Sequence, residues 1–311
     1  MQTDKRGYTV YDTNRLNQDH GQPGLRFRDD PSGLVFAEID NAHATATVCL
    51  QGAHLVTWRP KDQALPVVWV SEAARFAPGK SIRGGVPVCW PWFGPHATQA
   101  SFPAHGFART VPWQVTGTET TDEGATRLTL VLLQNEQTRA QFAHACRLEL
   151  SLTIGANLRA ALVTTNLDSE TLSIGEALHT YFQIGDIGQT RVLGLEGCAY
   201  VDKVEGGVRK RQDGPIAFAG ETDRVYVDTE AQCVIEDPVL RRRILIDKSG
   251  SRSTVVWTPW QEKADKMGDL GPNDGWRRMV CVESGNALDN VVSIAPGAAH
   301  TLAVNYRAEA T

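Results

Sequence analysis

Long hydrophobic runs are absent from this chain of 311 residues. None approaches the roughly 18 consecutive apolar residues that a membrane-spanning helix needs, so the sequence predicts no membrane partner. Residues 2–6 are polar, and no apolar segment of the signal-peptide type follows them. We therefore expect a cytoplasmic protein.

The chain also lacks an excess of positive charge. It has 31 Lys and Arg against 36 Asp and Glu, a formal net charge of −5. A nucleic-acid-binding protein usually shows a basic stripe, whereas this chain has only short basic runs such as Arg-Arg-Arg at 241–243, typical of a solvated strand or turn edge. We predict no nucleic-acid partner. If this acidic chain binds an anion, it must gather positive charge locally.

Metal-binding spacings are missing as well. The eight histidines include no His-x-x-x-His pair, and no Cys-x-x-Cys pair occurs. A chain of this length needs no disulfide staples, so we expect reduced thiols. The sequence predicts no metal and no cofactor. The six cysteines are Cys49, Cys89, Cys146, Cys198, Cys233 and Cys281.

What the chain does contain is many short strand patterns. Residues 147–154 alternate strictly, with Leu and Ile on one face and polar side chains on the other, as in a half-buried strand. Only residues 138–143 and 262–267 suggest helix. Many short strands separated by turn residues favour an all-β sandwich or barrel, which we place in one domain at 25–311 after a loose polar lead-in at 1–24. The other expected strands are 34–39, 46–50, 67–70, 128–133, 158–165, 171–178, 191–195, 225–228, 233–236, 241–246, 254–257, 279–283 and 301–306.

The stretch 82–109 is the most distinctive part of the chain. Its first half is rich in Gly and Pro, so it is neither an ordinary helix nor a central strand. Arg83 and Arg109 bracket it, and Trp90 and His105 lie between them. Arginine side chains bind phosphate or carboxylate, and aromatic faces cover the apolar face of a sugar. The stretch therefore predicts a site for a small, anionic, polyhydroxylated ligand.

Several segments, in a fixed order along the chain, carry a resemblance to a known family. They are Ile-Arg-Gly-Gly-Val-Pro at 82–87, Trp-Pro-Trp-Phe-Gly-Pro at 90–95, Pro-Ala-His-Gly-Phe-Ala-Arg at 103–109, Ala-Leu-His-Thr-Tyr-Phe at 177–182, Thr-Asp-Arg-Val-Tyr at 222–226 and Val-Cys-Val-Glu at 280–283. Together they resemble the hexose-6-phosphate mutarotases, the glucose-6-phosphate 1-epimerase branch of the aldose 1-epimerase superfamily. The resemblance implies a large antiparallel β-sandwich of the galactose-mutarotase type with a few short helices.

The resemblance also implies an activity, the interconversion of the α and β anomers of a hexose 6-phosphate. A base removes the C1 hydroxyl proton, an acid protonates the ring oxygen, and reclosure reverses both steps without a cofactor. The expected partner is a small sugar phosphate, and the protein is expected to be a monomer or a weak homo-oligomer. Two alternatives stay open: an epimerase of neutral hexoses, and a non-catalytic sugar-phosphate-binding protein on the same fold.

Three residues are candidates for the acid–base chemistry. Glu283 ends the apolar run 279–282 and precedes Ser-Gly, so it can face a pocket; we predict that it is the base. By the resemblance, His179 is the acid, and we expect a nearby Glu283 to raise its pKa. His105 is expected to orient the substrate or to stabilise the ring oxygen.

Four further residues are candidates for substrate binding. Arg83 and Arg109 are predicted to hold the phosphate, and the glycine pair after Arg83 is expected to let the backbone approach the ligand. The resemblance implies that Asp223 accepts hydrogen bonds from sugar hydroxyls. The indole of Trp90 is expected to cover the sugar face.

Two positions depart from the family pattern. Ala104 stands where some members have a glutamine that binds substrate, and Thr258 stands where asparagine is expected in Trp-Asn-Pro-Trp. Neither is part of the acid–base pair. Both leave the preferred sugar open.

Overall fold

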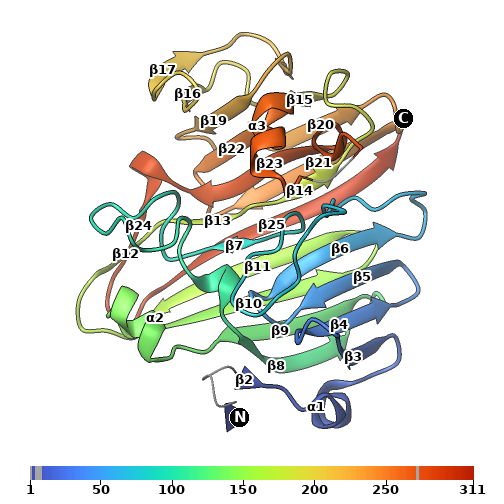
Figure 1. Ribbon diagram of the computed structural model, residues 1–311, viewed down its shortest axis with the longest axis vertical. Helices are drawn as coiled ribbons and strands as arrows, with labels where there is room; N and C mark the ends of the chain where they lie inside the picture. Colours follow the sequence, from blue (N-terminus) through green and yellow to red (C-terminus); the bar gives the residue numbers. More distant parts are fainter. Residues whose placement is uncertain (1, 4–8, 271–272) are drawn as a thin grey trace.

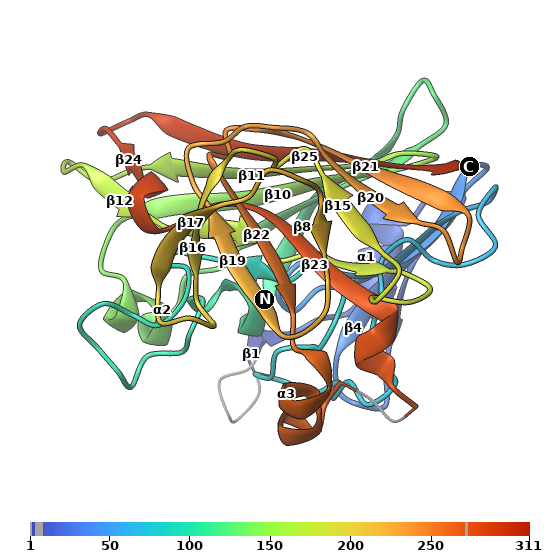
Figure 2. The ribbon, with the colours of Figure 1, turned by 90° about the horizontal axis from the view of Figure 1, so that it is seen from above.

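The computed structural model describes residues 2–3, 9–270 and 273–311. Two large antiparallel sheets dominate it and pack face to face (Figure 1). Seen from above, β25, β21 and β11 of one sheet run along the top, β19, β22 and β23 of the other lie below them, and α3 lies at the bottom (Figure 2). The expected all-β sandwich with a few short helices is confirmed.

The first large sheet has nine strands, and its residues alternate as the sequence predicts. Along 146–154 every second side chain is buried and those between are partly or fully exposed. The alternation buries one face of the sheet against the rest of the molecule. In spatial order the strands are β18 (Ile216–Ala217), β15 (Arg191–Leu193), β20 (Cys233–Asp237), β21 (Arg242–Ser249), β25 (Ala299–Ala310), β11 (Leu158–Asn166), β10 (Cys146–Ile154), β9 (Thr126–Leu132) and β8 (Trp113–Thr120).

The second large sheet positions the site. Val256, Val280 and Val282 belong to the central hydrophobic cluster, whereas Val225 and Val255 belong to a small cluster on the opposite face. This sheet is therefore covered on both sides. Its order is β17 (Val208–Arg211), β16 (Ala199–Asp202), β19 (Thr222–Tyr226), β22 (Ser253–Thr258), β23 (Met279–Asn286), β13 (Glu176–Leu178) and β7 (Val88–Cys89), with β14 (Tyr181–Gln183) also paired to β23.

Smaller elements complete the fold. A four-stranded sheet contains β3 (Leu25–Asp29), β4 (Val35–Asp40), β5 (Ala44–Cys49) and β6 (His54–Pro60). Two-stranded sheets pair β12 (Leu172–Ile174) with β24 (Val292–Ile294), and β1 (Gln2–Thr3) with β2 (Thr9–Val10). The helices are α1 (Thr13–His20), α2 (Glu136–Gln141) and α3 (Trp260–Met267), with 3-10 turns η1 (Ala108–Thr110), η2 (Gly275–Arg278) and η3 (Leu288–Asn290). Within the described ranges, no helix is long and apolar enough to cross a membrane.

Two expectations from the sequence are wrong. The lead-in 1–24 is not loose where the structure describes it, because Asp12 caps α1 and the Tyr11 hydroxyl donates to the Trp113 carbonyl at 2.8 Å. The prediction for residues 1 and 4–8 lies outside the described residues. The expected strand at 67–70 forms only isolated bridges, because the segment changes partner midway: Val68 pairs with Phe182 of β14, and Val70 pairs with Gly84.

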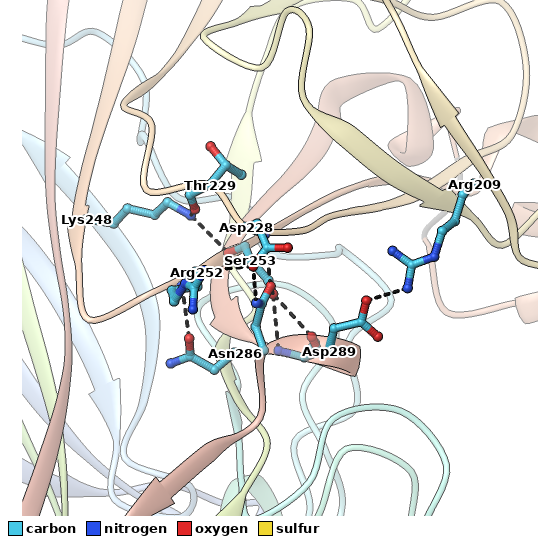
Figure 3. Close-up of polar contacts among 10 residues, drawn as sticks. Arg209, Asp228, Thr229, Lys248, Arg252, Ser253, Asn286 and Asp289 are labelled. Atoms are coloured by element: carbon cyan, nitrogen blue, oxygen red, sulfur yellow. Dashed lines mark hydrogen bonds and ion pairs between the residues drawn. The ribbon is translucent and has the colours of Figure 1, made fainter.

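A polar network at one end of the second sheet fixes the η3 turn (Figure 3). The Asn290 side chain accepts from the backbone amide of Asp228 and from Ser253 Oγ, both at 3.0 Å, and donates to Asp228 Oδ1 at 2.9 Å. Asp289 pairs with Arg209 across the same turn. These contacts hold η3, whose Leu288 lines the cleft described below.

A buried carboxylate lies between the two large sheets. Glu176 on β13 is fully buried, and its Oε1 is 3.0 Å from both His300 Nε2 and Asn286 Nδ2. The hydrogen bond to Glu176 raises the pKa of the His300 imidazole above its ordinary 6.5. The pair links β13 and β23, which carry the site residues, to β25 of the other sheet.

We predict that His300→Gln destabilises the protein in a pH-dependent way. Since the folded-state pKa of His300 is raised, its stabilisation is complete below about 6.5 and is lost as pH rises through the folded value. The charged hydrogen bond suggests a loss of about 1–3 kcal/mol at pH 5.5, smaller at pH 8.5. Urea unfolding at both pH values measures it. His144→Gln, at the exposed His144–Asp168 contact, is the matched control, and an equal loss at both pH values would contradict the prediction.

Candidate active site

A cleft of about 720 Å³ opens on the face of the second sheet that points away from the first. Its floor comes from β19, β22 and β23, and its walls come from the 82–109 stretch, α3 and η3. The cleft therefore collects segments that are far apart in the sequence. Its lining includes all the site residues that the sequence predicted except Trp90: Arg83, His105, Arg109, His179, Asp223 and Glu283.

Strand register creates the floor as two parallel rows of side chains. In one row Glu283 is opposite Val255, which is opposite Val225. In the next row Tyr181, Cys281, Trp257 and Asp223 are successive cross-strand partners. The ladders of β13 and β14 against β23 keep one register, so His179, which lies between them, falls opposite Glu283.

His179 and Glu283 meet at the bottom of the cleft. His179 Nε2 lies 3.3 Å from Glu283 Oε1, and the two side chains are 12% and 1% exposed. Burial raises the pKa of the Glu283 carboxyl well above 4.5, and Asp223 adds to the rise. Burial lowers the pKa of the His179 imidazole well below 6.5, and His105 and Arg109 add to the fall. The expectation that Glu283 raises the pKa of His179 is therefore wrong, because desolvation outweighs the carboxylate.

These opposite shifts define the proton content of the pair. The pair shares one transferable proton. That proton can be on the carboxyl, beside a neutral imidazole, or on the imidazole, beside a carboxylate. Burial favours the uncharged arrangement, because a low-dielectric environment penalises both charges. A ligand that donates to Glu283 and accepts from His179 stabilises the charged arrangement through its hydrogen bonds. The pair can thus act as one base and one acid.

His105 is held in a fixed orientation next to this pair. Its backbone has the left-handed φ of 65°, and its amide donates to the Gly94 carbonyl at 2.7 Å. Its Nδ1 accepts from the Gly94 amide at 3.3 Å, and its ring centroid is 5.8 Å from that of His179. Burial, with Arg109 and Arg83, lowers the pKa of His105 to about 3. A neutral ring whose Nδ1 accepts carries its proton on Nε2 and can donate it to a ligand.

The position after His105 must be occupied by glycine. Gly106 has φ +69°, and a Cβ there would stand 2.0 Å from the Trp90 carbonyl oxygen. The glycine pair after Arg83 has a different role from the one expected. A Cβ on Gly85 would meet His54 Nε2 at 2.2 Å, and neither glycine lines the cleft. These two glycines let the backbone pack closely against the protein interior, not against a ligand.

The two predicted arginines both reach the cleft but differ in their bonding. Arg83 Nε donates to Asp269 Oδ2 at 3.0 Å, and its Nη1 donates to the Tyr181 hydroxyl at 3.0 Å. Arg109 Nη2 donates to the carbonyl of Ala104 at 2.9 Å. Arg83 is therefore partly neutralised by a carboxylate. At position 104, where some family members have glutamine, the backbone carbonyl of Ala104 orients Arg109.

Trp90 does not contact the cleft, so its predicted role in substrate binding is wrong. Its side chain is fully buried, and the indole Nε1 donates to Thr164 Oγ1 at 3.1 Å. Phe93 and Trp257 line the cleft instead. The residue type of Trp90 suits contact with a sugar, but close packing of the loop over the sandwich turns its indole inward.

Asp223 stands at the far end of the second row. Burial raises the pKa of its carboxyl above the ordinary 3.8, against the opposing effect of Lys263 and Lys203. Both lysines line the cleft, and Lys263 pairs with Glu221 at 2.6 Å. Sequence reasoning missed the two lysines and Asp269, since nothing in their local sequence separates them from surface residues. When these three residues are included, four Arg or Lys and three Asp or Glu side chains line the cleft. Basic side chains thus outnumber acidic ones in the cleft, although the whole chain has a net charge of −5.

The fold and the cleft together define a class: a β-sandwich whose cleft holds a buried carboxyl–imidazole pair and a positively charged rim. A family model described as "Aldose 1-epimerase" matches residues 36–307. The chain belongs to the aldose 1-epimerase family.

Relatives with more specific names are similar over most of the chain. A protein of Escherichia coli (strain K12) named "Putative glucose-6-phosphate 1-epimerase" is 39% identical over 252 residues, 81% of this chain and 83% of that protein. A protein of the same name from Cenchrus ciliaris is 31% identical over 277 residues, 86% and 82% of the two chains. The crystal structure of a "putative mutarotase (YeaD)" from Salmonella typhimurium has a TM-score of 0.86 and 34% identity, covering 93% of this chain and 95% of that one.

We predict that His105 stays neutral down to about pH 4 with its proton on Nε2. The reason is its burial beside two arginines, which places its pKa at about 3. Long-range ¹H–¹⁵N spectra of ¹⁵N-histidine-labelled protein report both the tautomer and the titration. The His105→Asn spectrum assigns the signal. A His105 signal that titrates above pH 5, or that shows the Nδ1–H tautomer, would contradict the prediction.

Proposed function

We propose that the protein is a cofactor-independent hexose-6-phosphate 1-epimerase with glucose 6-phosphate as its preferred substrate. The observation that carries the proposal is the His179–Glu283 pair, 3.3 Å apart, at the bottom of a cleft with a cationic rim. The names of the relatives support the phosphate-bearing substrate. The geometry supports acid–base chemistry, since it brings two proton-transferring groups to one place.

In the proposed reaction Glu283, as carboxylate, takes the proton of the C1 hydroxyl. His179, as imidazolium, gives its proton to the ring oxygen, and the C1–O bond electrons move to that oxygen. The open aldehyde rotates about its C1–C2 bond and recloses from the other face, with both proton transfers reversed. His105 donates from Nε2 to a substrate oxygen, and Asp223 accepts from a hydroxyl.

The proposed phosphate site uses the cationic rim. Arg109 is the main candidate, because its charge is not offset by a carboxylate in the described residues, whereas Arg83 pairs with Asp269. Arg83 Nη2 has no hydrogen-bond partner in the part of the chain that the structure describes, so it can contribute one bond. A positive rim on an acidic protein also raises the local concentration of a phosphate dianion.

We predict that Glu283→Gln lowers kcat by about 10²- to 10⁴-fold, the usual contribution of one positioned acid–base group. The amide keeps the shape but cannot take a proton, so KM should change little. Two-dimensional exchange NMR of α- and β-glucose 6-phosphate measures the rate. Glu236→Gln, the same change at an outer ion pair on β20, is the control. Unchanged turnover in Glu283→Gln would rule out the assigned base.

We predict that Arg109→Gln weakens the binding of glucose 6-phosphate. One charge-assisted hydrogen bond contributes about 1.5–3 kcal/mol, so KM should rise by about 10- to 150-fold, with any turnover of free glucose unaffected. Arg243→Gln on β21 is a matched control, because Arg243 pairs with Glu236 far from the cleft. An equal loss for the phosphate and the free sugar would show that Arg109 only supports the loop.

The wild-type exchange experiment separates the proposal from its two alternatives. Faster anomer exchange for glucose 6-phosphate alone supports the proposal. Equal acceleration for glucose and glucose 6-phosphate identifies an epimerase of neutral hexoses. Binding of the sugar phosphate without any acceleration identifies a non-catalytic sugar-phosphate-binding protein.

A further inference from the structure

One cysteine next to the acid–base pair has no role in the proposed reaction. Cys281 is the cross-strand neighbour of Tyr181 on one side and Trp257 on the other, and it precedes Glu283 by two residues on the same face of β23. Its thiol is fully buried, and Cys281 is not among the residues that line the cleft. The Cys281 Sγ, one nitrogen of His179 and one carboxylate oxygen of Glu283 all lie within 4.8 Å of one another.

This combination of donors suits a zinc ion. Zn²⁺ takes thiolate sulfur at about 2.3 Å and imidazole nitrogen or carboxylate oxygen at about 2.0–2.2 Å. Ligand atoms around one tetrahedral ion are therefore about 3.3–3.7 Å apart, so side-chain adjustments of about an ångström bring these three into range. Sites with three protein ligands leave the fourth position open for water or another ligand. Here two of the three proposed ligands, His179 and Glu283, line the cleft.

The donor atoms have few competing partners. Glu283 Oε2 is buried and has no hydrogen-bond partner among the described residues, and the same holds for Nδ1 of His179. The imidazole is neutral, because burial lowers the pKa of His179, so a nitrogen lone pair is available to a metal. Two rim cations act on the pair: Arg83 is paired with Asp269, whereas Arg109 acts on both Glu283 and His179 and opposes a bound cation.

We propose that Cys281, His179 and Glu283 form a binding site for one Zn²⁺ ion, and that the bound ion switches off the acid–base pair. Binding displaces the proton of the Cys281 thiol and the proton of the Glu283 carboxyl, both to solvent, and forms three metal–ligand bonds. Zinc is an inhibitor here rather than a cofactor, because it occupies the lone pairs that the proposed reaction uses. Only the loss of activity rests on the proposed function; the binding itself does not.

The test uses the full chain with Co²⁺ as a spectroscopic probe and Zn²⁺ as competitor. We expect one Co²⁺ per chain, with a thiolate-to-cobalt charge-transfer band that Zn²⁺ removes. Cys281→Ser and Cys281→Ala should lose the band and weaken binding on the order of 100-fold or more, since the loss of even a supporting residue costs 10- to 100-fold. Cys198→Ser, which removes the one cysteine that is not fully buried, is the matched control and should keep the band.

Activity gives the second readout. Zn²⁺ should abolish anomer exchange in the wild type and in Cys198→Ser, and EDTA should restore it. The two Cys281 variants should lose their sensitivity to zinc, measured against each variant's own exchange rate without metal. Absence of a thiolate band in the wild type, or a band that persists in Cys281→Ser and disappears in Cys198→Ser, would overturn the proposal. Because the spectrum does not depend on turnover, it tests the metal site even if glucose 6-phosphate is not a substrate.

Discussion

The antiparallel register of β23 against β13, β14 and β22 is the constraint on which the site depends. It sets Glu283 opposite His179 on one side and Val255 on the other, and it aligns Cys281 with Tyr181 and Trp257 in the next row. A shift by one residue would turn all of these side chains to the opposite face. The core valines of the same strand prevent such a shift, because they would then leave the central hydrophobic cluster.

Burial gives this arrangement its chemistry. On the surface, a carboxylate and an imidazole would keep their ordinary pKa values and titrate separately. At the bottom of the cleft desolvation moves the two pKa values in opposite directions, so that the pair holds one proton between two sites. The same burial leaves lone pairs without partners, which are open to a substrate and, by our proposal, to a metal ion. The arginines and lysines on the rim supply the charge that attracts an anion to the cleft.

The rigidity of the site comes from contacts outside it. Glu176, His300 and Asn286 connect β13 and β23 to the opposite sheet, and the network around Asn290 holds the turn that carries Leu288. His105 keeps its left-handed backbone because Gly94 bonds both its amide and its ring. Side chains that must transfer protons within about 3 Å need such support, since their own hydrogen bonds to ligand form only transiently.

The sequence by itself determined the fold class, most strands and both helices that it suggested, because alternation of apolar residues and short motifs are local signals. It also named six candidate site residues that the structure brings to one cleft, although their roles stay predictions. Only the tertiary structure decided that Trp90 points inward, that Lys203, Lys263 and Asp269 reach the cleft, and that burial lowers rather than raises the pKa of His179. It also brought Cys281 to the acid–base pair. These outcomes depend on register, packing and desolvation among segments about a hundred residues apart, which no local pattern encodes.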